Sequence, residues 1–385
     1  MRSIKGILCF FLILFLLPGL DAHAGLPVPE TDVALSAPSA ILIEKETGTV
    51  IYEKNTRERY FPASITKIMT MLLIAEDLES GALSETDTVT ASQRAASFGG
   101  SCVYLESGEK MSVADMLKCI AVVSANDCAV AMAEHISGSE EAFVRRMNQR
   151  AAELGMTDTH FTNCSGLFDD GEHYTSAYDV ALMSRELLGH ALIKKYTTIW
   201  MDSIRGGEFE LSNTNKLVYW YPGCTGLKTG YTSTAMFCLS ATAEREGVEY
   251  IAVVMHAATA DARNADAEAL LDYAFAGFTL CPLRGGGALP EIPVELGKSP
   301  AIPLEYAGGQ YVLVPRSAGS AQPQYSLETP RSVKAPVKSG ERLGTLTVKL
   351  GDNTVAELPL LAAADVPRLG FFGLFKLLAG TMFGL

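Results

Sequence analysis

A serine and a lysine at the head of an apolar stretch constrain this chain most strongly. Ser64 follows Phe61-Pro-Ala63. After Ser64, apolar residues recur at helical spacing: Ile65, Ile68, Met69, Leu72 and Leu73. This spacing predicts a buried helix that Ser64 opens, with Lys67 one turn later on the same face. A hydroxyl at a helix N-terminus lies near unpaired backbone N–H groups, which favour the negative charge that develops during acyl transfer.

Lys67 is the candidate base for Ser64. An ordinary lysine has a pKa of about 10.4 and is a poor base at neutral pH, but burial and neighbouring cations lower that pKa. We therefore expect Lys67 to be neutral and to deprotonate Ser64. The same spacing recurs in Ser107-Gly-Glu-Lys110. There a glycine and two charges replace the apolar helical context, so this second copy predicts a surface turn.

Ser124-Ala-Asn126 is a second short polar motif. It lies between the apolar helical segments 111–123 and 128–136, which predicts a turn between two helices that line a cleft. Ser124 can pass a proton toward a leaving amine. Asn126 has donors and an acceptor for a substrate amide and for Lys67.

Lys228-Thr-Gly230 is the third motif. It precedes the apolar runs 237–243 and 250–255, which we predict to be strands of a central sheet, and the motif itself would lie on a strand at the edge of the cleft. Lys228 supplies positive charge and Thr229 a hydroxyl for a substrate carboxylate, while Gly230 lets a substrate backbone approach closely.

Both ends of the chain indicate export and membrane contact. Residues 1–24 have cations, an apolar run at 7–17 and the small-x-small sequence Ala22-His-Ala24, as in a cleavable signal peptide. The apolar run is shorter than the about 20 residues that span a bilayer. We expect an exported protein on the outer face of the cytoplasmic membrane, in the periplasm or cell wall space.

The mature chain divides by composition. Residues 25–280 form the predicted main domain, and 281–303 are rich in Gly and Pro, as in a linker. Short alternating runs in 304–365 predict a small β-sandwich. Residues 366–385 are rich in Phe and Leu with two cations, which predicts an amphipathic segment in the membrane interface. The alternative is a tail folded back on the sandwich.

The composition of the chain argues against several other classes of protein. A net charge of −13 disfavours a nucleic-acid partner, because such binding depends on Lys and Arg at phosphates. The histidines show no HExxH or similar spacing, so neither a metal nor another cofactor is predicted. The cysteines beyond the signal peptide are odd in number and lack CxxC pairs. We expect them to be buried as small apolar residues, with one disulfide pair as the alternative.

The three motifs occur in an order that marks a resemblance. Further matching segments are Phe61–Thr70, Asn163–Leu167 with His173 and Asp179, Asn213–Lys216, and Lys228–Thr232. From about Ala40 to Phe278 the chain resembles the D-alanyl-D-alanine carboxypeptidases, which are low-molecular-mass penicillin-binding proteins of peptidase family S11. The resemblance implies an α/β (α+β) domain of the penicillin-binding and β-lactamase type, with a central antiparallel sheet and a helical subdomain, followed by the small all-β sandwich.

The family's activity is likewise an implication of the resemblance. Ser64 would attack the penultimate D-Ala carbonyl of a peptidoglycan stem pentapeptide and release the terminal D-Ala, and β-lactam antibiotics would be covalent inhibitors. Lys67 and Ser124 would handle protons, and the backbone N–H groups of Ser64 and Tyr231 would hold the oxyanion. The substrate-binding positions are Asn126, Lys228, Thr229, Gly230, Tyr231 and Arg263. For Arg263 the alternative is a solvent-facing helix residue.

Three other functions remain open at this point. A β-lactamase shares the three motifs but needs an additional base; Glu208-Phe-Glu-Leu-Ser-Asn213 is similar to such a loop, yet it has an inserted Ser and lies too near Lys228. A peptidoglycan-binding scaffold without catalysis would have lost a motif residue, whereas all are intact. Endopeptidase activity on cross-linked D-Ala bonds would use the same site. Tyr231 and Met236 depart from the commonest family pattern, which bears on substrate preference and deacylation.

Overall fold

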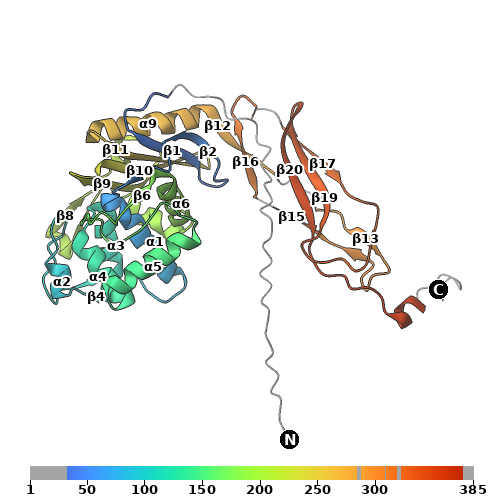
Figure 1. The fold of residues 1–385 in the computed structure, drawn as a ribbon, viewed down its shortest axis with the longest axis horizontal. Helices are drawn as coiled ribbons and strands as arrows, with labels where there is room; N and C mark the ends of the chain where they lie inside the picture. Colours follow the sequence, from blue (N-terminus) through green and yellow to red (C-terminus); the bar gives the residue numbers. More distant parts are fainter. Residues whose placement is uncertain (1–32, 284–287, 308, 319–321, 376–385) are drawn as a thin grey trace, which may run out of the picture. The chain divides into compact units, whose positions relative to one another are not determined.

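The computed structural model describes residues 33–283, 288–307, 309–318 and 322–375 (Figure 1). The chain divides into two compact units, one with the described residues of 26–282 and 311–322, the other with those of 283–310 and 323–385. The predicted signal peptide and the last ten residues of the predicted membrane segment lie outside the described residues.

A five-stranded antiparallel sheet forms the centre of the larger unit. Its order is β2-β1-β11-β10-β9. The strands are β1 (Ser39–Glu44), β2 (Val50–Lys54), β9 (Cys224–Thr232), β10 (Met236–Arg245) and β11 (Val248–Ala257). The predicted antiparallel sheet is confirmed, and the third motif lies on β9, the edge strand.

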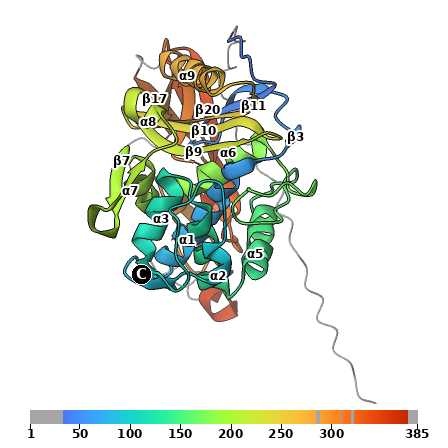
Figure 2. The same cartoon turned by 90° about the vertical axis from the view of Figure 1, so that its left-hand side faces the viewer.

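Both faces of the sheet are buried (Figures 1 and 2). Along β11, Ile251 and Val253 contact the helical side, whereas Tyr250 and Ala252 contact the single helix α9 (Ala260–Gly277) on the other side. Side chains alternate between the faces of a strand, so a strand covered on both faces is apolar throughout. This explains why the sequence of β11 shows a continuous apolar run.

The helical subdomain packs against one face of the sheet (Figure 2). Its main helices are α1 (Lys67–Glu79), α3 (Val113–Val122), α4 (Asn126–Ser137), α5 (Glu140–Glu153) and α6 (Ala177–Leu187). Nine consecutive residues of α1, from Lys67 to Ala75, are buried. The helix is therefore enclosed on all sides, because it runs through the middle of this subdomain, and this part of it has no solvent-facing stripe.

The structure refines one local prediction and confirms two others. Ser64 does not open α1 itself but lies in a preceding 3₁₀ turn, Ala63–Thr66, and α1 begins at Lys67. The second motif lies at the predicted turn, because α3 ends at Val122 and α4 begins at Asn126. Ser107 lies in an exposed turn before β5 (Lys110–Ser112), as predicted.

Short elements complete the larger unit. They are β3 (Arg59–Tyr60), η1 (Ala63–Thr66), β4 (Thr88–Thr90), α2 (Gln93–Ala96), β6 (Thr175–Ser176), η2 (Ala191–Ile193), α7 (Lys194–Thr197), β7 (Met201–Ile204), η3 (Arg205–Gly207), β8 (Phe209–Ser212), α8 (Leu217–Trp220), β12 (Phe278–Pro282) and β16 (Tyr311–Pro315). β16 pairs with β12.

The smaller unit contains two β-sheets, as the sequence predicts, but the predicted strand at Tyr311–Pro315 is not part of it, because β16 pairs with β12 in the larger unit. Its four-stranded sheet has the order β15-β20-β19-β17, and its three-stranded sheet has the order β14-β13-β18. The strands are β13 (Ile292–Glu295), β14 (Ala301–Ile302), β15 (Leu304–Tyr306), β17 (Pro323–Glu328), β18 (Val333–Lys334), β19 (Arg342–Leu350) and β20 (Asn353–Ala362). The stretch predicted as a linker thus contains two strands, since Ile292 and Val294 alternate with exposed residues and are buried.

The described part of the C-terminal segment ends in one helical turn at 371–375. Phe371, Phe372 and Phe375 expose 79%, 86% and 67% of their surface. Among the described residues, none of the helices combines the length and apolarity that crossing a bilayer requires.

Candidate active site

The three motifs meet in one cleft of the larger unit, with a volume of about 360 Å³. Residues that line it include Ser64, Ser124, Thr229, Gly230, Tyr231 and Arg263. The other three predicted site residues, Lys67, Asn126 and Lys228, are buried. Lys67 forms hydrogen bonds with both Ser64 and Asn126.

The Lys67 amine lies in contact with the Ser64 hydroxyl. Its Nζ is 2.8 Å from Ser64 Oγ, and it donates to Asn126 Oδ1 and to the Ser165 carbonyl, each at 2.7 Å. Burial lowers the pKa of Lys67 to about 7, although Cys164, Cys102 and Asp127 act in the opposite direction. A neutral amine has two N–H groups and one lone pair. The two carbonyl oxygens take the N–H groups, so the lone pair is left for the Ser64 proton.

The Ser64 turn is held by close backbone contacts. Ala63 has φ +48°, and Thr66 Oγ1 donates to its carbonyl at 2.8 Å. A Cβ on Gly230 would lie 2.8 Å from the Pro62 carbonyl and 3.1 Å from Ile65 N. The motif predicts that Gly230 allows a substrate backbone to approach. The structure shows that the glycine is needed first for the packing of β9 against the protein's own backbone.

The loop 163–167 has a role in the site that the motifs do not predict. The Ser165 carbonyl is the second acceptor of Lys67, and Gly166, at φ +70°, packs so closely that a Cβ would lie 1.8 Å from the Ala63 carbonyl oxygen. Asn163 Oδ1 accepts from Gly166 N at 2.7 Å, and Thr70 Oγ1 donates to the Cys164 carbonyl at 2.7 Å. A carbonyl oxygen has no signature in sequence, so only the family segment Asn163–Leu167 could have indicated it.

A buried histidine connects this loop to the Ser64 turn. Since Thr66 Oγ1 donates to Ala63, His173 Nε2 must donate to Thr66 Oγ1, at 2.7 Å. His173 Nδ1 accepts from Thr162 N at 3.0 Å. Burial lowers the pKa of His173 to about 4, so the ring is neutral at physiological pH. His173 is therefore a fixed hydrogen-bonding bridge and not a base.

The turn between α3 and α4 presents Ser124 to the cleft. Ser124 has φ +64° and is buried, and among the described residues its Oγ finds no hydrogen-bond partner. Asn126 donates through Nδ2 to the Gly99 carbonyl at 2.8 Å and through its backbone N to the Ser101 carbonyl at 2.7 Å. The side-chain amide is thus fixed, with one N–H still free for a substrate.

Lys228 and Arg263 place further positive charge beside the cleft. Burial and the nearby charges of Lys67 and Arg263 hold the pKa of Lys228 well below its usual value. Burial lowers the pKa of Arg263 to about 10, and its guanidinium donates to Asn264 Oδ1 at 2.9 and 3.1 Å. Arg263 is only 6% exposed, so the solvent-facing alternative is wrong. In the described part of the chain, neither side chain forms an ion pair, and an anionic ligand would stabilise the charged form of both.

Known proteins share this arrangement across both units. The family model "D-alanyl-D-alanine carboxypeptidase" (Peptidase S11) matches residues 27–259, and the model "Penicillin-binding protein 5, C-terminal domain" matches residues 283–368. The chain belongs to the S11 family of D-alanyl-D-alanine carboxypeptidases. It is 43% identical over 350 residues to the D-alanyl-D-alanine carboxypeptidase DacF of Bacillus subtilis, covering 90% of each chain.

More distant relatives support the same family assignment. The Escherichia coli D-alanyl-D-alanine carboxypeptidase DacC is 31% identical, with 94% of this chain and 91% of the relative covered. The crystal structure of penicillin-binding protein 5 from Haemophilus influenzae superposes with a TM-score of 0.79 at 28% identity, covering 88% of this chain and 100% of that one. This S11 protein is therefore a serine-type carboxypeptidase that removes the terminal D-alanine from peptidoglycan stem peptides and binds penicillin.

The β-lactamase alternative loses its candidate base. Glu208 and Glu210 lie at the β7–β8 hairpin and not among the residues that line the cleft.

Tyr231, which departs from the commonest family pattern, is 57% exposed and stacks on Phe237 with ring centroids 4.3 Å apart.

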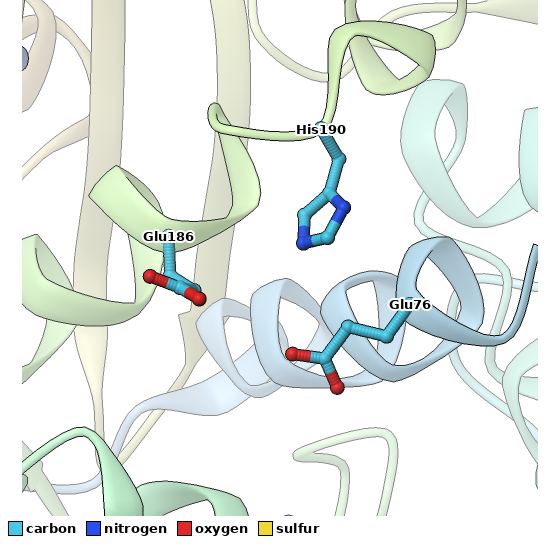
Figure 3. Close-up of side chains that lie close together, drawn as sticks. All are labelled: Glu76, Glu186 and His190. Atoms are coloured by element: carbon cyan, nitrogen blue, oxygen red, sulfur yellow. The ribbon is translucent and has the colours of Figure 1, made fainter. Parts of the chain in front are cut away.

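Three metal-ligating side chains come together outside this cleft, a grouping that sequence spacing does not reveal. Ligand atoms of Glu76, Glu186 and His190, which come from α1, α6 and the residues after α6, lie within 4.8 Å of one another (Figure 3). Arg150 contacts both carboxylates, with Nε 2.7 Å from Glu76 Oε1 and Nη2 2.5 Å from Glu186 Oε1. Since the guanidinium already neutralises part of this acidic charge, the group is an ion-pair network that connects α1, α5 and α6.

The cysteines of the described residues form no disulfide. Five are buried, and Cys102 and Cys224 are partly exposed. Burial raises the pKa of the Cys164 thiol next to Lys67 well above its usual value, so that thiol is neutral. The predicted role as small apolar residues therefore holds for the buried five.

We predict that Gly166→Ala slows acylation by penicillin at least tenfold. The added Cβ cannot fit against the Ala63 carbonyl, so the loop that presents the Ser165 carbonyl to Lys67 must shift. The measurement is the acylation rate with a fluorescent penicillin, together with the melting temperature. Gly171→Ala is the matched control, because Gly171 also has positive φ, +81°, but has no atoms within 4 Å of the added carbon. Equal acylation rates in the two variants would contradict the role of this contact.

Proposed function

We propose that Ser64 is the nucleophile of the carboxypeptidase reaction and Lys67 its general base. The observation that carries this assignment is the 2.8 Å contact between Lys67 Nζ and Ser64 Oγ, made by a buried amine with a pKa of about 7. A base with a pKa near the working pH is both unprotonated and strong enough to accept a proton. The same contact with a fully protonated ammonium would leave Ser64 without a base.

Acylation follows from these positions. Lys67 takes the Ser64 proton as Oγ attacks the penultimate D-Ala carbonyl carbon, and the backbone N–H groups of Ser64 and Tyr231 hold the oxyanion. The C–N bond then breaks, and the amine of the terminal D-Ala receives a proton through Ser124 Oγ. The unpartnered Ser124 hydroxyl at the cleft supports this relay. The products of this step are free D-Ala and an ester on Ser64.

Deacylation uses the same groups in reverse. Water attacks the ester carbonyl, Lys67 accepts the proton of the water, and Ser64 Oγ leaves with a proton as the shortened stem peptide departs. Asn126 would bind the substrate amide through its remaining N–H group. Thr229 and Arg263, which line the cleft, and the buried Lys228 would bind the terminal carboxylate. An endopeptidase reaction would differ only in the leaving amine.

The proposed organisation places the enzyme outside the cell. Residues 1–24 would direct export, the described residues of 26–282 and 311–322 would form the carboxypeptidase domain, and those of 283–310 and 323–365 would form the β-domain. Residues 366–385 would lie in the interface of the cytoplasmic membrane, at its outer face. The exposed rings of Phe371, Phe372 and Phe375 support this role, because such rings gain free energy by leaving water.

Replacing Ser64 by Ala is expected to abolish covalent labelling by penicillin and D-Ala release, because Ser64 carries the only hydroxyl among the described residues that hydrogen-bonds to Lys67 Nζ. Intact mass spectrometry after incubation with benzylpenicillin, with peptide mapping of the adduct, is the measurement. Ser107→Ala, in the second copy of the Ser-x-x-Lys spacing, serves as the control and should label normally. Labelling that persists in the Ser64 variant would place the nucleophile elsewhere.

The acylation rate should depend on the protonation of Lys67. Only the neutral amine can accept the Ser64 proton, so with a pKa of about 7 the rate should fall about tenfold per pH unit below pH 6 and level off above pH 8. Stopped-flow acylation between pH 5.5 and 9 measures this profile. Lys67→Arg keeps the charge but cannot act as a base, and it should be inactive throughout. A flat profile, or an active arginine variant, would refute the assignment.

Deletion of residues 367–385 should move the protein from the membrane to the soluble fraction and leave penicillin labelling intact. The cause would be the loss of the apolar segment that includes the three exposed Phe side chains. Fractionation of cells that express the full and shortened chains measures the distribution. A chain of full length with Phe371, Phe372 and Phe375 replaced by Ser should behave like the deletion. If both variants stay with the membrane, the anchor lies elsewhere.

A further inference from the structure

An exposed aromatic patch borders the cleft. It consists of Trp200, Tyr219 and Trp220, which include both tryptophans of the chain. Tyr219 exposes 69% of its surface and Trp220 46%, and the rings of Trp200 and Tyr219 pack with centroids 5.1 Å apart at 30°. Trp220 also lines the cleft that contains Ser64. The patch therefore meets the cleft at Trp220, which follows Tyr219 in α8 (Leu217–Trp220).

The patch is held rigidly on the edge of the sheet. Trp220 Nε1 donates to Glu268 Oε1 at 2.6 Å, and Asn213 N donates to the Trp200 carbonyl at 2.9 Å. Asn215 Nδ2 donates to the Gly226 carbonyl on β9 at 2.8 Å, which places α8 beside that strand (Figure 2). The Thr229 hydroxyl of the third motif donates to Thr214 Oγ1 at 2.8 Å. The loop that carries the patch thus contacts the substrate-binding strand directly.

We propose that this aromatic patch binds the glycan strand of peptidoglycan, by stacking of N-acetylhexosamine rings on Tyr219 and its neighbours. This inference rests on the proposed function, since the stem peptide substrate is attached to such a glycan. A pyranose ring presents a face of C–H groups and keeps its hydroxyls at the rim. It can therefore cover an exposed aromatic ring while its hydroxyls stay in water.

The size and surroundings of the patch favour a sugar over a protein. A stable protein partner buries about 800 Å² on each side, and three partly covered rings fall short of that area. Lys216 and Glu268 adjoin the rings, so the apolar surface does not extend further in those directions. A disaccharide unit matches a surface of two or three rings, and its neutral character does not require a charged partner.

A direct titration tests binding. Both tryptophans lie in the patch, so their fluorescence should change as the wild-type protein is titrated with tetra-N-acetylchitotetraose, a neutral sugar oligomer without a stem peptide. Calorimetry gives the affinity of each variant. Tyr219→Ala should weaken binding about three- to tenfold, as expected for the loss of one stacked ring. Tyr219→Phe keeps the ring and should bind as the wild type does. Tyr104→Ala removes an aromatic ring outside the patch, 74% exposed, and should have no effect.

A kinetic comparison connects the patch to the reaction. Tyr219→Ala should lower kcat/KM about three- to tenfold on pentapeptides attached to glycan strands and leave kcat/KM unchanged on diacetyl-Lys-D-Ala-D-Ala, which has no sugar. No binding of the oligomer by the wild type, or an equal loss in the alanine and phenylalanine variants, would overturn the proposal. Self-association that Tyr219→Ala abolishes would assign the patch to a second copy of the chain and overturn it as well. A wild-type protein that releases D-Ala from neither substrate would refute the proposed function, while the titration would still decide on the patch.

Discussion

The buried amine of Lys67 is the constraint on which the site depends. An amine removed from water must find partners for its N–H groups, since an unsatisfied polar group in the interior costs about 1–3 kcal/mol. The partners come from three separate segments: the Ser64 turn, the turn at Asn126 and the loop that carries Ser165. These segments must therefore be held together to within hydrogen-bonding distance of a single nitrogen atom.

The unusual backbone conformations of the site follow from that requirement. Ala63, Ser124 and Gly166 all have positive φ, and each lies in one of the segments that surround Lys67. A non-glycine residue at positive φ costs free energy, so the surrounding packing must compensate for it. Two glycines do so by allowing close approach, Gly166 to the Ala63 carbonyl and Gly230 to the Pro62 carbonyl. The close packing around these segments therefore stabilises the strained backbone conformations that the site requires.

The sequence predicts those parts of the molecule that depend on local pattern. The strands β10 and β11 are visible as apolar runs, and the proximity of Lys67 to Ser64 follows from helical spacing. The Ser165 carbonyl, the bridge at His173 and the burial of Arg263 are not visible, because each depends on a residue distant in the chain. The two strands within 281–303 were missed for a related reason. The Gly and Pro residues hide a short alternation of buried and exposed side chains. These short strands are stabilised only by pairing with other strands.

The charges of the cleft connect binding to turnover. Burial lowers the pKa of Lys228, and the positive charges of Lys67 and Arg263 lower it further when these groups are protonated. On the proposed roles, a substrate carboxylate would offset this repulsion when it binds. The repulsion would return when D-Ala leaves with its carboxylate, and this would favour the neutral form of Lys67 that deacylation requires. In a penicillin the carboxylate stays attached to the acyl group after ring opening. On the same roles, the anion would then remain beside Lys228 and Arg263, and an anion near Lys67 would favour its protonated form. The electrostatics proposed for turnover of the peptide would therefore work against release of the antibiotic.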